Sequence, residues 1–306
     1  MKTLVLGGSG FIGSALNALL LESIDTDVVV FDASQPRSFP DDARVRFVKG
    51  FFDSGTDFDQ LTKGVDVVIH LVSTSVPGTE QDALREMNRN VIPSIALFEA
   101  AVANGVRRIV FMSSGGTVYG KGDGNGTPNA ETDPLRPMNT YGFQKVMIEN
   151  ALRFVCRNSA TEYQIIRLSN PYGPGQNPHG PLGLITKLVY QTLHHEQVTI
   201  YGDGSVTRDF IYIDDAVQGI IDILRHGNAN DTYNLGTGVG VSVRDVVETI
   251  QRELPERMLL THQPGRPVDV PVSVLDVGKY RAISTIARFV PLDEGIRRTA
   301  RFFEGH

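Results

Sequence analysis

The chain has little cysteine and no surplus of basic residues, and each of these two features excludes certain classes of function. Cys156 is the single cysteine, which excludes a disulfide framework and any zinc or iron–sulfur site built from several cysteines. The formal net charge of −6 argues against a nucleic-acid-binding protein, because neutralising phosphates requires an excess of Lys and Arg. The seven histidines include no His-x-x-x-His pair, so we expect no metal site.

The N-terminal region also lacks long apolar runs. The apolar stretch 15–21 is far too short to span a bilayer, and Glu22 and Asp25 close it. Residues 2–6 run directly into glycines, so the unbroken apolar region of a signal peptide is missing. These features predict a cytoplasmic protein that does not contact a membrane.

Short apolar runs alternate with helical patterns through the first half of the chain. The runs are rich in Val, Ile and Phe, as is typical of strands buried on both faces. We expect strands at 3–6, 27–31, 45–48, 65–71, 108–112 and 164–168, and helices at 13–22, 83–104 and 141–158. This alternation predicts an α/β fold, a Rossmann-type doubly wound parallel sheet.

The pattern becomes irregular beyond residue 170. Residues 172–181 include three glycines and three prolines, which is typical of a domain boundary. We therefore divide the chain into domain 1–172 and a smaller mixed α/β domain 173–306, with a return of the chain to the first domain expected around 209–236. In the second part, the start Ser242 to Asp245 resembles a helix capping box.

Glycine, in contrast, is abundant, and three glycines form one turn between a predicted strand and a predicted helix. In Gly7-x-x-Gly10-x-x-Gly13, the first permits a tight turn, the second lets backbone approach a pyrophosphate and the third lets helix and strand pack. Asp32 ends the second strand, where its carboxylate is placed to accept from ribose hydroxyls and would repel a 2′-phosphate. The pattern favours NAD, although Arg37 nearby could serve NADP instead.

Tyr141 and Lys145 are four residues apart, which places a phenol and an ammonium on one helix face. A free tyrosine has a pKa near ~10 and is a poor base at neutral pH. We expect the lysine cation, together with a positive nicotinamide ring, to lower that pKa, so that Tyr141 can take a hydroxyl proton as hydride leaves.

These motifs, with several others in the same order, resemble the extended short-chain dehydrogenase/reductase superfamily, and within it the NAD-dependent nucleotide-sugar epimerase/dehydratase family. The resemblance covers nearly the full chain and is closest to the UDP-glucose/UDP-galactose 4-epimerase type. It is carried by Gly7-x-x-Gly10-x-x-Gly13, Phe52-Asp53, His70-Leu71-Val72, Asn90-Val91, residues 113–120, Tyr141-x-x-x-Lys145 and residues 167–174, 201–204 and 208–215.

The resemblance implies a role for each matching residue. Tyr141 would be the base and Lys145 its tuner. The NAD-binding residues would be Gly7, Gly10, Phe11, Ile12, Gly13, Asp32, Phe52, Asp53, Leu71, Val72, Ser73, Asn90, Ser113, Tyr141, Lys145 and Pro171. The nucleotide-sugar, with UDP favoured, would contact Ser114, Gly115, Thr117, Asn170, Arg208, Arg266 and Asp269.

One position departs from the family pattern. Members often carry Ser or Thr where this chain has Gly115, to hydrogen-bond the reacting sugar hydroxyl. Either Ser114 or Thr117 must then supply the hydroxyl, with Ser114 favoured, or Tyr141 acts alone. The stretch 114–117 also lacks the acidic residue of dehydratases and decarboxylases, which favours epimerisation.

Other functions stay open at this stage. A nucleotide-sugar dehydratase or reductase, or a UDP-uronate epimerase or decarboxylase, shares the same binding motifs. A non-catalytic dinucleotide-binding protein is the alternative of another class, and the intact Tyr141/Lys145 pair argues against it. The resemblance implies a homodimer, because family dimers form a four-helix bundle in which helices 83–104 and 141–158 would bury an outer face. Packing of these helices within one chain is the alternative.

Overall fold

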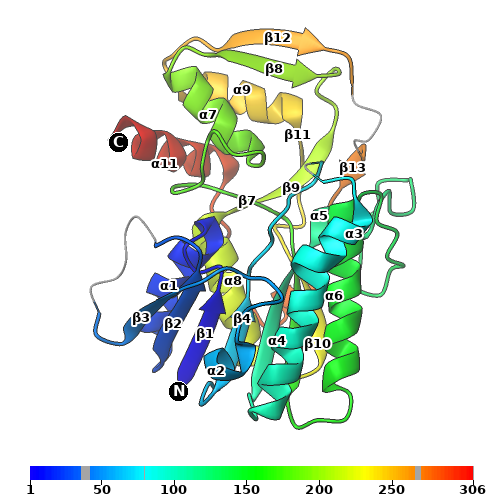
Figure 1. The fold of residues 1–306 in the computed structure, drawn as a ribbon. Coiled ribbons are helices and arrows are strands. Elements are labelled where there is room, and N and C mark those ends of the chain that lie inside the picture. The colour runs from blue at the N-terminus through cyan, green and yellow to red at the C-terminus, as the bar shows by residue number, and fades with distance from the viewer. Residues whose placement is uncertain (36–41, 79, 266–269, 306) are drawn as a thin grey trace.

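The computed structural model describes residues 1–35, 42–78, 80–265 and 270–305. Its larger part is a parallel sheet of seven strands in the order β10-β6-β5-β4-β1-β2-β3 (Figure 1). The strands are β1 (Lys2–Leu6), β2 (Asp27–Asp32), β3 (Val45–Lys49), β4 (Val67–His70), β5 (Arg108–Ser114), β6 (Glu162–Leu168) and β10 (Asp231–Leu235). All six strands predicted for the first half are present, and the Rossmann-type fold is confirmed.

Helices cover both faces of this sheet. On one face α1 (Phe11–Ser23) packs against α8 (Ile213–His226). On the other face α4 (Ile92–Ala103) packs against α2 (Phe58–Thr62) and α6 (Thr140–Cys156), and the short α5 (Gly115–Val118) follows β5 (Figure 1). Parallel strands buried on both sides in this way explain the near-continuous apolar runs of the sequence.

The segment predicted as one helix over 83–104 is divided in the structure. It begins as α3 (Ala83–Glu86), continues as a π-helical turn η1 (Met87–Val91) and becomes α4, with the Ile92 N–H donating to the Met87 carbonyl. Pro93, near the start of α4, has no N–H and its ring disfavours an ordinary α-helical turn before it. The wider turn accommodates the proline without ending the helix.

The smaller part is mixed. Strand β9 (Thr207–Tyr212) pairs in parallel with β7 (Asn170–Tyr172) and β13 (Val272–Ser273) and antiparallel with β11 (Gly240–Ser242). Strand β8 (Gln197–Tyr201) pairs with β12 (Leu259–Gln263), and helices α7 (Leu184–Leu193), α9 (Val243–Glu253) and α11 (Leu292–Glu304) pack together in this part. The short α10 (Gly278–Arg281) contacts β10 of the large sheet instead. The capping box of Ser242 and Asp245 at the start of α9 is confirmed.

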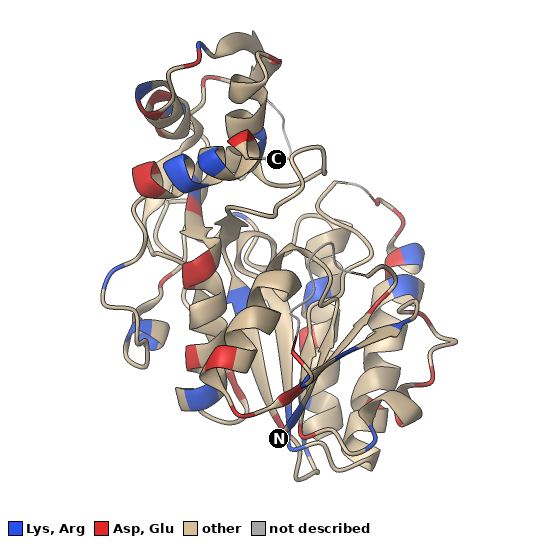
Figure 2. Ribbon diagram, turned by 90° about the vertical axis from the view of Figure 1, so that its left-hand side faces the viewer, with Lys and Arg blue, Asp and Glu red and all other residues tan. Residues whose placement is uncertain are grey.

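The two parts share a hydrophobic core. One apolar cluster runs from the α1/α8 face of the large sheet into the smaller part, where Ile185, Val189 and Val246 are fully buried. A second cluster fills the α2/α4/α6 face. In the smaller part, charged residues of both signs lie on the helix surfaces (Figure 2), and on α11 Arg297 and Arg298 pair with Glu294. This division leaves the carboxyl ends of the large sheet facing the smaller part.

Candidate active site

The glycine turn lies where β1 ends and α1 begins. Gly7 has a φ of +79°, and a Cβ on Gly13 would lie 2.5 Å from the Gly7 carbonyl oxygen, so neither position accepts a side chain without strain. Gly10 is the N-cap of α1 and carries no side chain, and Phe11 and Ile12 follow in the first helical turn. The N–H groups of that turn have no intrahelical acceptor and the dipole there is positive, which suits a phosphate.

Asp32 lies beside this turn. Its Oδ2 accepts from the backbone N–H of Ser9 at 3.0 Å and its Oδ1 from that of Ser34 at 3.3 Å. The carboxylate is therefore fixed at the end of β2, next to the glycines, as a ribose-binding acid requires. Arg37, the residue that could have served NADP, is outside the described residues.

Phe52 and Asp53 have different surroundings although they are adjacent. Asp53 lines a surface pocket with Phe51, and its Oδ1 accepts from the Gly55 N–H at 2.8 Å. Phe52 is buried and its ring packs against Phe58 and His70. Asp53 is the one of the two that faces a pocket, and Phe52 supports the core behind it.

The segment after β4 is tied to its neighbours by side chains. Leu71 still donates its N–H to the Leu6 carbonyl, and Val72 packs on the α2/α4/α6 core. The Ser73 hydroxyl donates to the Ser75 carbonyl at 2.8 Å and accepts from Gln144 on α6 at 3.2 Å. These contacts hold Leu71, Val72 and Ser73 beside the glycine turn, since a Cβ on Gly7 would lie 3.1 Å from the Val72 nitrogen.

Asn90, on the π-helical turn, fixes the same segment from the other side. Its Oδ1 accepts from the N–H of Thr74 at 2.9 Å and from the Thr74 hydroxyl at 3.1 Å. Its Nδ2 donates to Glu86 at 2.9 Å. Asn90 is buried, and its hydrogen bonds hold the segment at Thr74 against the helix that carries Glu86.

Tyr141 and Lys145 are brought together with Ser114 at the carboxyl end of β5. Asn139 caps α6 by accepting from the Gly142 N–H, which begins the helix directly before Tyr141. The Tyr141 side chain hydrogen-bonds to Ser114. Lys145 donates from Nζ to the Met112 carbonyl at 2.9 Å and lies 5.6 Å from the Tyr141 ring centroid.

Burial has opposite effects on the pKa values of Tyr141 and Lys145. Burial raises it to about 12, the Ser114 hydrogen bond lowers it only in part, and the Glu86 carboxylate raises it further. Burial lowers the pKa of Lys145 to about 8, against the opposing charges of Glu149 and Glu86. Burial of the phenol therefore dominates the pKa of Tyr141, and the lowering expected from Lys145 together with a nicotinamide ring stays a prediction.

The turn after β5 explains why residue 115 is glycine. A Cβ there would lie 2.6 Å from Cδ1 of Leu275, a buried side chain that belongs to the C-terminal part. Thr117 has a buried hydroxyl with no hydrogen-bond partner among the described residues. Ser114 contacts Tyr141, whereas the Thr117 hydroxyl has no partner among the described residues, so Ser114 and Thr117 are the two hydroxyls next to Gly115.

Ser113 points away from this group, into a buried polar network that the sequence did not suggest. Its hydroxyl donates to Glu149 at 2.6 Å, and Arg167 donates to both oxygens of the same carboxylate at 3.1 and 2.8 Å. Arg167 also donates to the Tyr119 hydroxyl, which in turn donates to Asn234 on β10. The spacing of residues 141, 145 and 149 on one helix face was the available signal.

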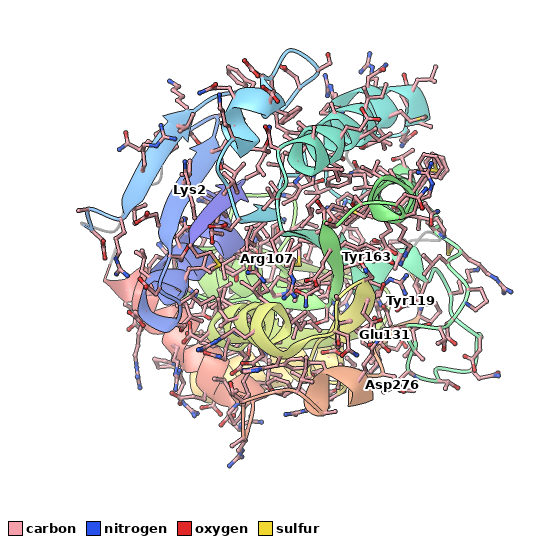
Figure 3. All side chains as sticks on the ribbon, turned by 90° about the horizontal axis from the view of Figure 1, so that it is seen from below. Lys2, Arg107, Tyr119, Glu131, Tyr163 and Asp276 are labelled. Atoms are coloured by element: carbon pink, nitrogen blue, oxygen red, sulfur yellow. The ribbon has the colours of Figure 1, made fainter. Side chains whose placement is uncertain are left out.

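The network reaches the outer edge of the sheet. The backbone N–H of Asn234 donates to Oε1 of Glu131 at 2.8 Å, and its Nδ2 donates to the carbonyl of Asp276 at 3.1 Å. Seen from below, Tyr119, Glu131 and Asp276 lie together at that edge (Figure 3). The strand that carries Ser114 and the helix that carries Tyr141 are thereby anchored to the C-terminal segment.

Two of the predicted substrate residues, Asn170 and Arg208, lie on strands of the smaller part. Asn170 donates to the Asp209 carbonyl at 2.8 Å, and Pro171 follows it on β7, in register with Ile211. Arg208, on β9, donates from Nη1 to the Val270 carbonyl at 2.6 Å. Arg266 and Asp269 lie outside the described residues.

Several observations indicate that these residues fit a dinucleotide and a second ligand. The turn at Gly7 to Gly13 is a backbone cradle that no side chain fills. Around it and the Tyr141 group lie buried polar atoms with no partner in the described part of the chain: Ser9 Oγ, Glu86 Oε1, Thr117 Oγ1, Gln144 Oε1 and Ser169 Oγ. Buried polar groups are normally satisfied, so such a cluster marks a site completed by a ligand.

The described residues form neither a metal-ligand cluster nor a membrane-spanning helix. Among the described residues, no three His, Cys, Asp or Glu side chains are grouped so that they could hold a metal ion. None of the described helices combines the length and apolar character needed to cross a membrane.

Comparison with known proteins places this geometry in context. Residues 3–236 match the model of the NAD dependent epimerase/dehydratase family. The chain is 32% identical over 302 residues to the dTDP-4-dehydro-6-deoxyglucose reductase of Escherichia coli, covering 96% of this chain and 94% of that protein. It is 32% identical over 310 residues to a UDP-glucose 4-epimerase of Mycolicibacterium smegmatis, covering 99% and 98%.

The fold is similar to solved structures over its whole length. The UDP-glucose 4-epimerase of Thermotoga maritima, solved with UDP-glucose, superposes with a TM-score of 0.92 at 29% identity and covers 100% of this chain and 99% of that one. The two sequence relatives and the Thermotoga maritima enzyme are all named for nucleotide-linked sugars, although the named reactions differ.

Proposed function

Because the chain belongs to the NAD-dependent epimerase/dehydratase family, an extended short-chain dehydrogenase/reductase, we propose that it is a nucleotide-sugar 4-epimerase. Its substrate would be a UDP-hexose or UDP-N-acetylhexosamine. The observation that carries the proposal is the group of Tyr141, Ser114 and Lys145 at the end of β5, in a turn that offers no acidic side chain.

Tyr141 would take the proton from the sugar 4-hydroxyl. Bound NAD would supply reversible hydride-transfer chemistry at this position. The raised pKa of Tyr141 means that the phenol is protonated at neutral pH on the protein's own account, so the ammonium of Lys145 must help to stabilise the phenolate. Ser114, which already hydrogen-bonds Tyr141, and Thr117 would hold the reacting hydroxyl.

The remaining residues would hold the two ligands. Gly7, Gly10 and Gly13 would receive the NAD pyrophosphate, and Asp32 its ribose. Asn170 and Arg208 would bind the pyrophosphate of the nucleotide-sugar, with Arg266 and Asp269 toward its phosphate and ribose. A 4-keto sugar held through its diphosphate can turn and present its other face, and return of hydride to that face inverts C4.

The absence of an acid separates epimerisation from elimination. Loss of water from the sugar needs a general acid for the departing hydroxyl. The stretch Ser114, Gly115, Gly116, Thr117 carries none, and Leu275 occupies the space beside Gly115. The proposed site therefore oxidises and reduces at C4 without eliminating.

A reductase is the second candidate, because the similar protein of Escherichia coli is named a dTDP-4-dehydro-6-deoxyglucose reductase. The two activities use the same residues. They differ in whether reduced cofactor is consumed, since an epimerase regenerates its cofactor in each turnover.

The deciding experiment incubates the purified protein with UDP-glucose, UDP-N-acetylglucosamine or UDP-glucuronate in separate tubes, without added cofactor, and follows products by proton NMR. Interconversion of axial and equatorial protons at C4 in one tube supports the epimerase and identifies its sugar. A parallel tube holds dTDP-4-dehydro-6-deoxyglucose with NADH or NADPH. Reduction there, with no turnover of any UDP-sugar, overturns the epimerase in favour of the reductase.

We also propose a homodimer, and a division into 1–172 and 173–306 in which the chain returns to the first part around 209–236, with α8 on its face and β10 in its sheet. Large apolar side chains remain exposed on the outer face of the α3/α4/α6 layer: Leu84, Ile92, Phe143 and Phe154. Such a patch fits a self-association surface, in which α4 and α6 of two copies would meet. Light scattering should give twice the chain mass, and Phe154→Glu should shift it toward the monomer.

A further inference from the structure

The segments that follow β1 and β4 flank one position at the carboxyl edge of the large sheet. These two strands pair in parallel, and the strand order reverses between them (Figure 1). In open parallel sheets a dinucleotide binds at such a point. The glycine turn lies on the β1 side and residues 71–75 lie on the β4 side, with the Val72 nitrogen 3.1 Å from the position of a Cβ on Gly7. Whatever fixes residues 71–75 therefore fixes one side of the cofactor site.

Gln144 connects this β4 side to the helix that carries Tyr141 and Lys145. It lies between these two residues on α6 and is fully buried. Its Nε2 donates to the hydroxyl of Ser73 at 3.2 Å and to that of Ser75 at 3.0 Å. Because the Ser73 hydroxyl already donates to the Ser75 carbonyl, it can only accept from Gln144, which fixes the orientation of the amide.

A second amide holds the residue between the two serines. Asn90, on η1, accepts from both the N–H and the hydroxyl of Thr74. Consecutive residues of the segment are therefore held by two different helical elements, α6 and η1. The Asn90 bonds remain when Gln144 is replaced, so we expect such a replacement to loosen Ser73 and Ser75 without detaching the whole segment.

Stability of the fold does not explain a glutamine at position 144. Its Oε1 is buried and has no hydrogen-bond partner in the described part of the chain, and a buried acceptor without a partner destabilises a protein. Ser73 and Ser75 are partly exposed, so their hydroxyls can bond to water without it. An apolar side chain of the same size would fill the space without the unpaired oxygen. What the amide adds is the fixed position of the two serines.

We propose that Gln144 is a positioning residue for the cofactor: through Ser73 and Ser75 it fixes the β4 side of the site and slows the release of NAD. Slow release suits an enzyme that regenerates its cofactor in each turnover, and this use rests on the proposed function. The effect of Gln144 on NAD does not, because the family is NAD-dependent whichever sugar reaction the chain catalyses.

The test measures the release of radiolabelled NAD from the purified protein after an excess of unlabelled NAD is added. Gln144→Leu removes the donor and keeps a side chain of similar size, and we expect NAD to dissociate about 10-fold faster. Gln251→Leu, at an exposed position of α9, is the matched control and should leave the rate unchanged. A merely structural glutamine would change the melting temperature of the NAD-free protein and not the release rate, and that result overturns the proposal.

A double-mutant cycle tests whether Gln144 acts through the serines. Ser75→Ala removes one acceptor and leaves α6 intact, so it should speed NAD release by about 3-fold. The double variant Gln144→Leu/Ser75→Ala should release NAD no faster than Gln144→Leu, because the bond to Ser75 is already lost. Effects that multiply in the double variant overturn the proposal. If Gln144→Leu does not fold, Ser75→Ala alone decides, and an unchanged release rate in that variant also overturns it.

Discussion

The turn after β1 and the turn after β5 are built on the same plan, and they owe their glycines to different causes. Each follows a buried strand and opens a helix at the edge of the sheet where the smaller part lies. In the first, a Cβ on Gly13 would meet backbone of its own turn, at 2.5 Å from Gly7. In the second, a Cβ on Gly115 would meet Leu275, from a segment far along the chain, at 2.6 Å.

The glycine at the first turn is required by contacts within the turn, whereas the glycine at the second is required by a contact with a distant segment. Backbone cannot withdraw from backbone within one turn, so the first glycine pattern is intrinsic to phosphate binding and is legible in any sequence that has it. The space beside Gly115 depends on how the C-terminal part packs. The close contact at Gly13 lies within the first turn itself, whereas the close contact at Gly115 comes from a distant segment of the chain.

Substitution of Tyr141 should have the largest effect on activity. Tyr141→Phe removes the proton acceptor of the second turn and leaves the first turn intact, so kcat should fall by about 10²–10⁴-fold. Binding of NAD and nucleotide-sugar, measured by calorimetry, should stay near the wild-type values. Tyr163→Phe, on β6, is the control; activity of Tyr141→Phe close to that of the control would remove the tyrosine from the mechanism.

Gly13→Ala should be the most damaging change to the fold. Its Cβ meets the Gly7 carbonyl, which cannot move without disrupting the turn, and overpacking of this kind costs about 1–3 kcal/mol or more. Thermal unfolding and the NAD content of the purified protein measure the loss. Gly10→Ala, whose Cβ would lie 3.4 Å from the same oxygen, should keep the fold and weaken NAD binding; equal melting temperatures for the two variants would contradict this account.

Gly115→Ser tests whether the second turn is governed by Leu275. Alone it should destabilise the protein by about 1–3 kcal/mol in denaturant unfolding, because its Cβ would overlap a buried side chain. In a Leu275→Ala background the same change should cost less than about 1 kcal/mol, which is a coupling that a double-mutant cycle detects. Gly116→Ser is the control, since the nearest atom to its Cβ is 3.8 Å away; equal effects at 115 and 116 would refute the claim.

Asp32→Asn should have the smallest effect. Removing the negative charge weakens the repulsion of a 2′-phosphate, so the preference for NAD over NADP should fall by roughly 10-fold, or ~1.4 kcal/mol. The affinity for NAD should fall slightly as well, because the bonds to Ser9 and Ser34 weaken. Asp25→Asn, exposed before β2, should change neither affinity. A preference unchanged in Asp32→Asn would show that Asp32 only shapes the glycine turn.

The sequence was sufficient where structure is decided locally. The strands at 3–6 and 27–31 and the capping box at Ser242 follow from apolar runs and cap chemistry, and the structure confirms them. It was insufficient where distant segments meet. The Leu275 contact, the Arg167 bonds to Glu149 and the raised pKa of Tyr141 all depend on packing across the sheet.

The division of helix 83–104 shows a middle case. Pro93 was visible in the sequence and predicts a local disturbance. That the chain would insert a wider turn, and thereby place Glu86 and Asn90 against the site, depended on the fit of α3 and α4 to α6. Residue identity signalled the irregularity, and tertiary packing chose its form.

The pairing of β10 with β6 has a consequence for the newborn chain. Strand β6 is synthesised well before its partner, with residues 169–230 between them. At about 5–20 residues per second, the ribosome leaves the β6 edge unpaired for several seconds. During that time Tyr119, which accepts from Arg167, lacks its acceptor Asn234 on β10. An open strand edge is a template for wrong partners. Translation speed across residues 169–230, and chaperones that shield that edge, should therefore govern the yield of native protein.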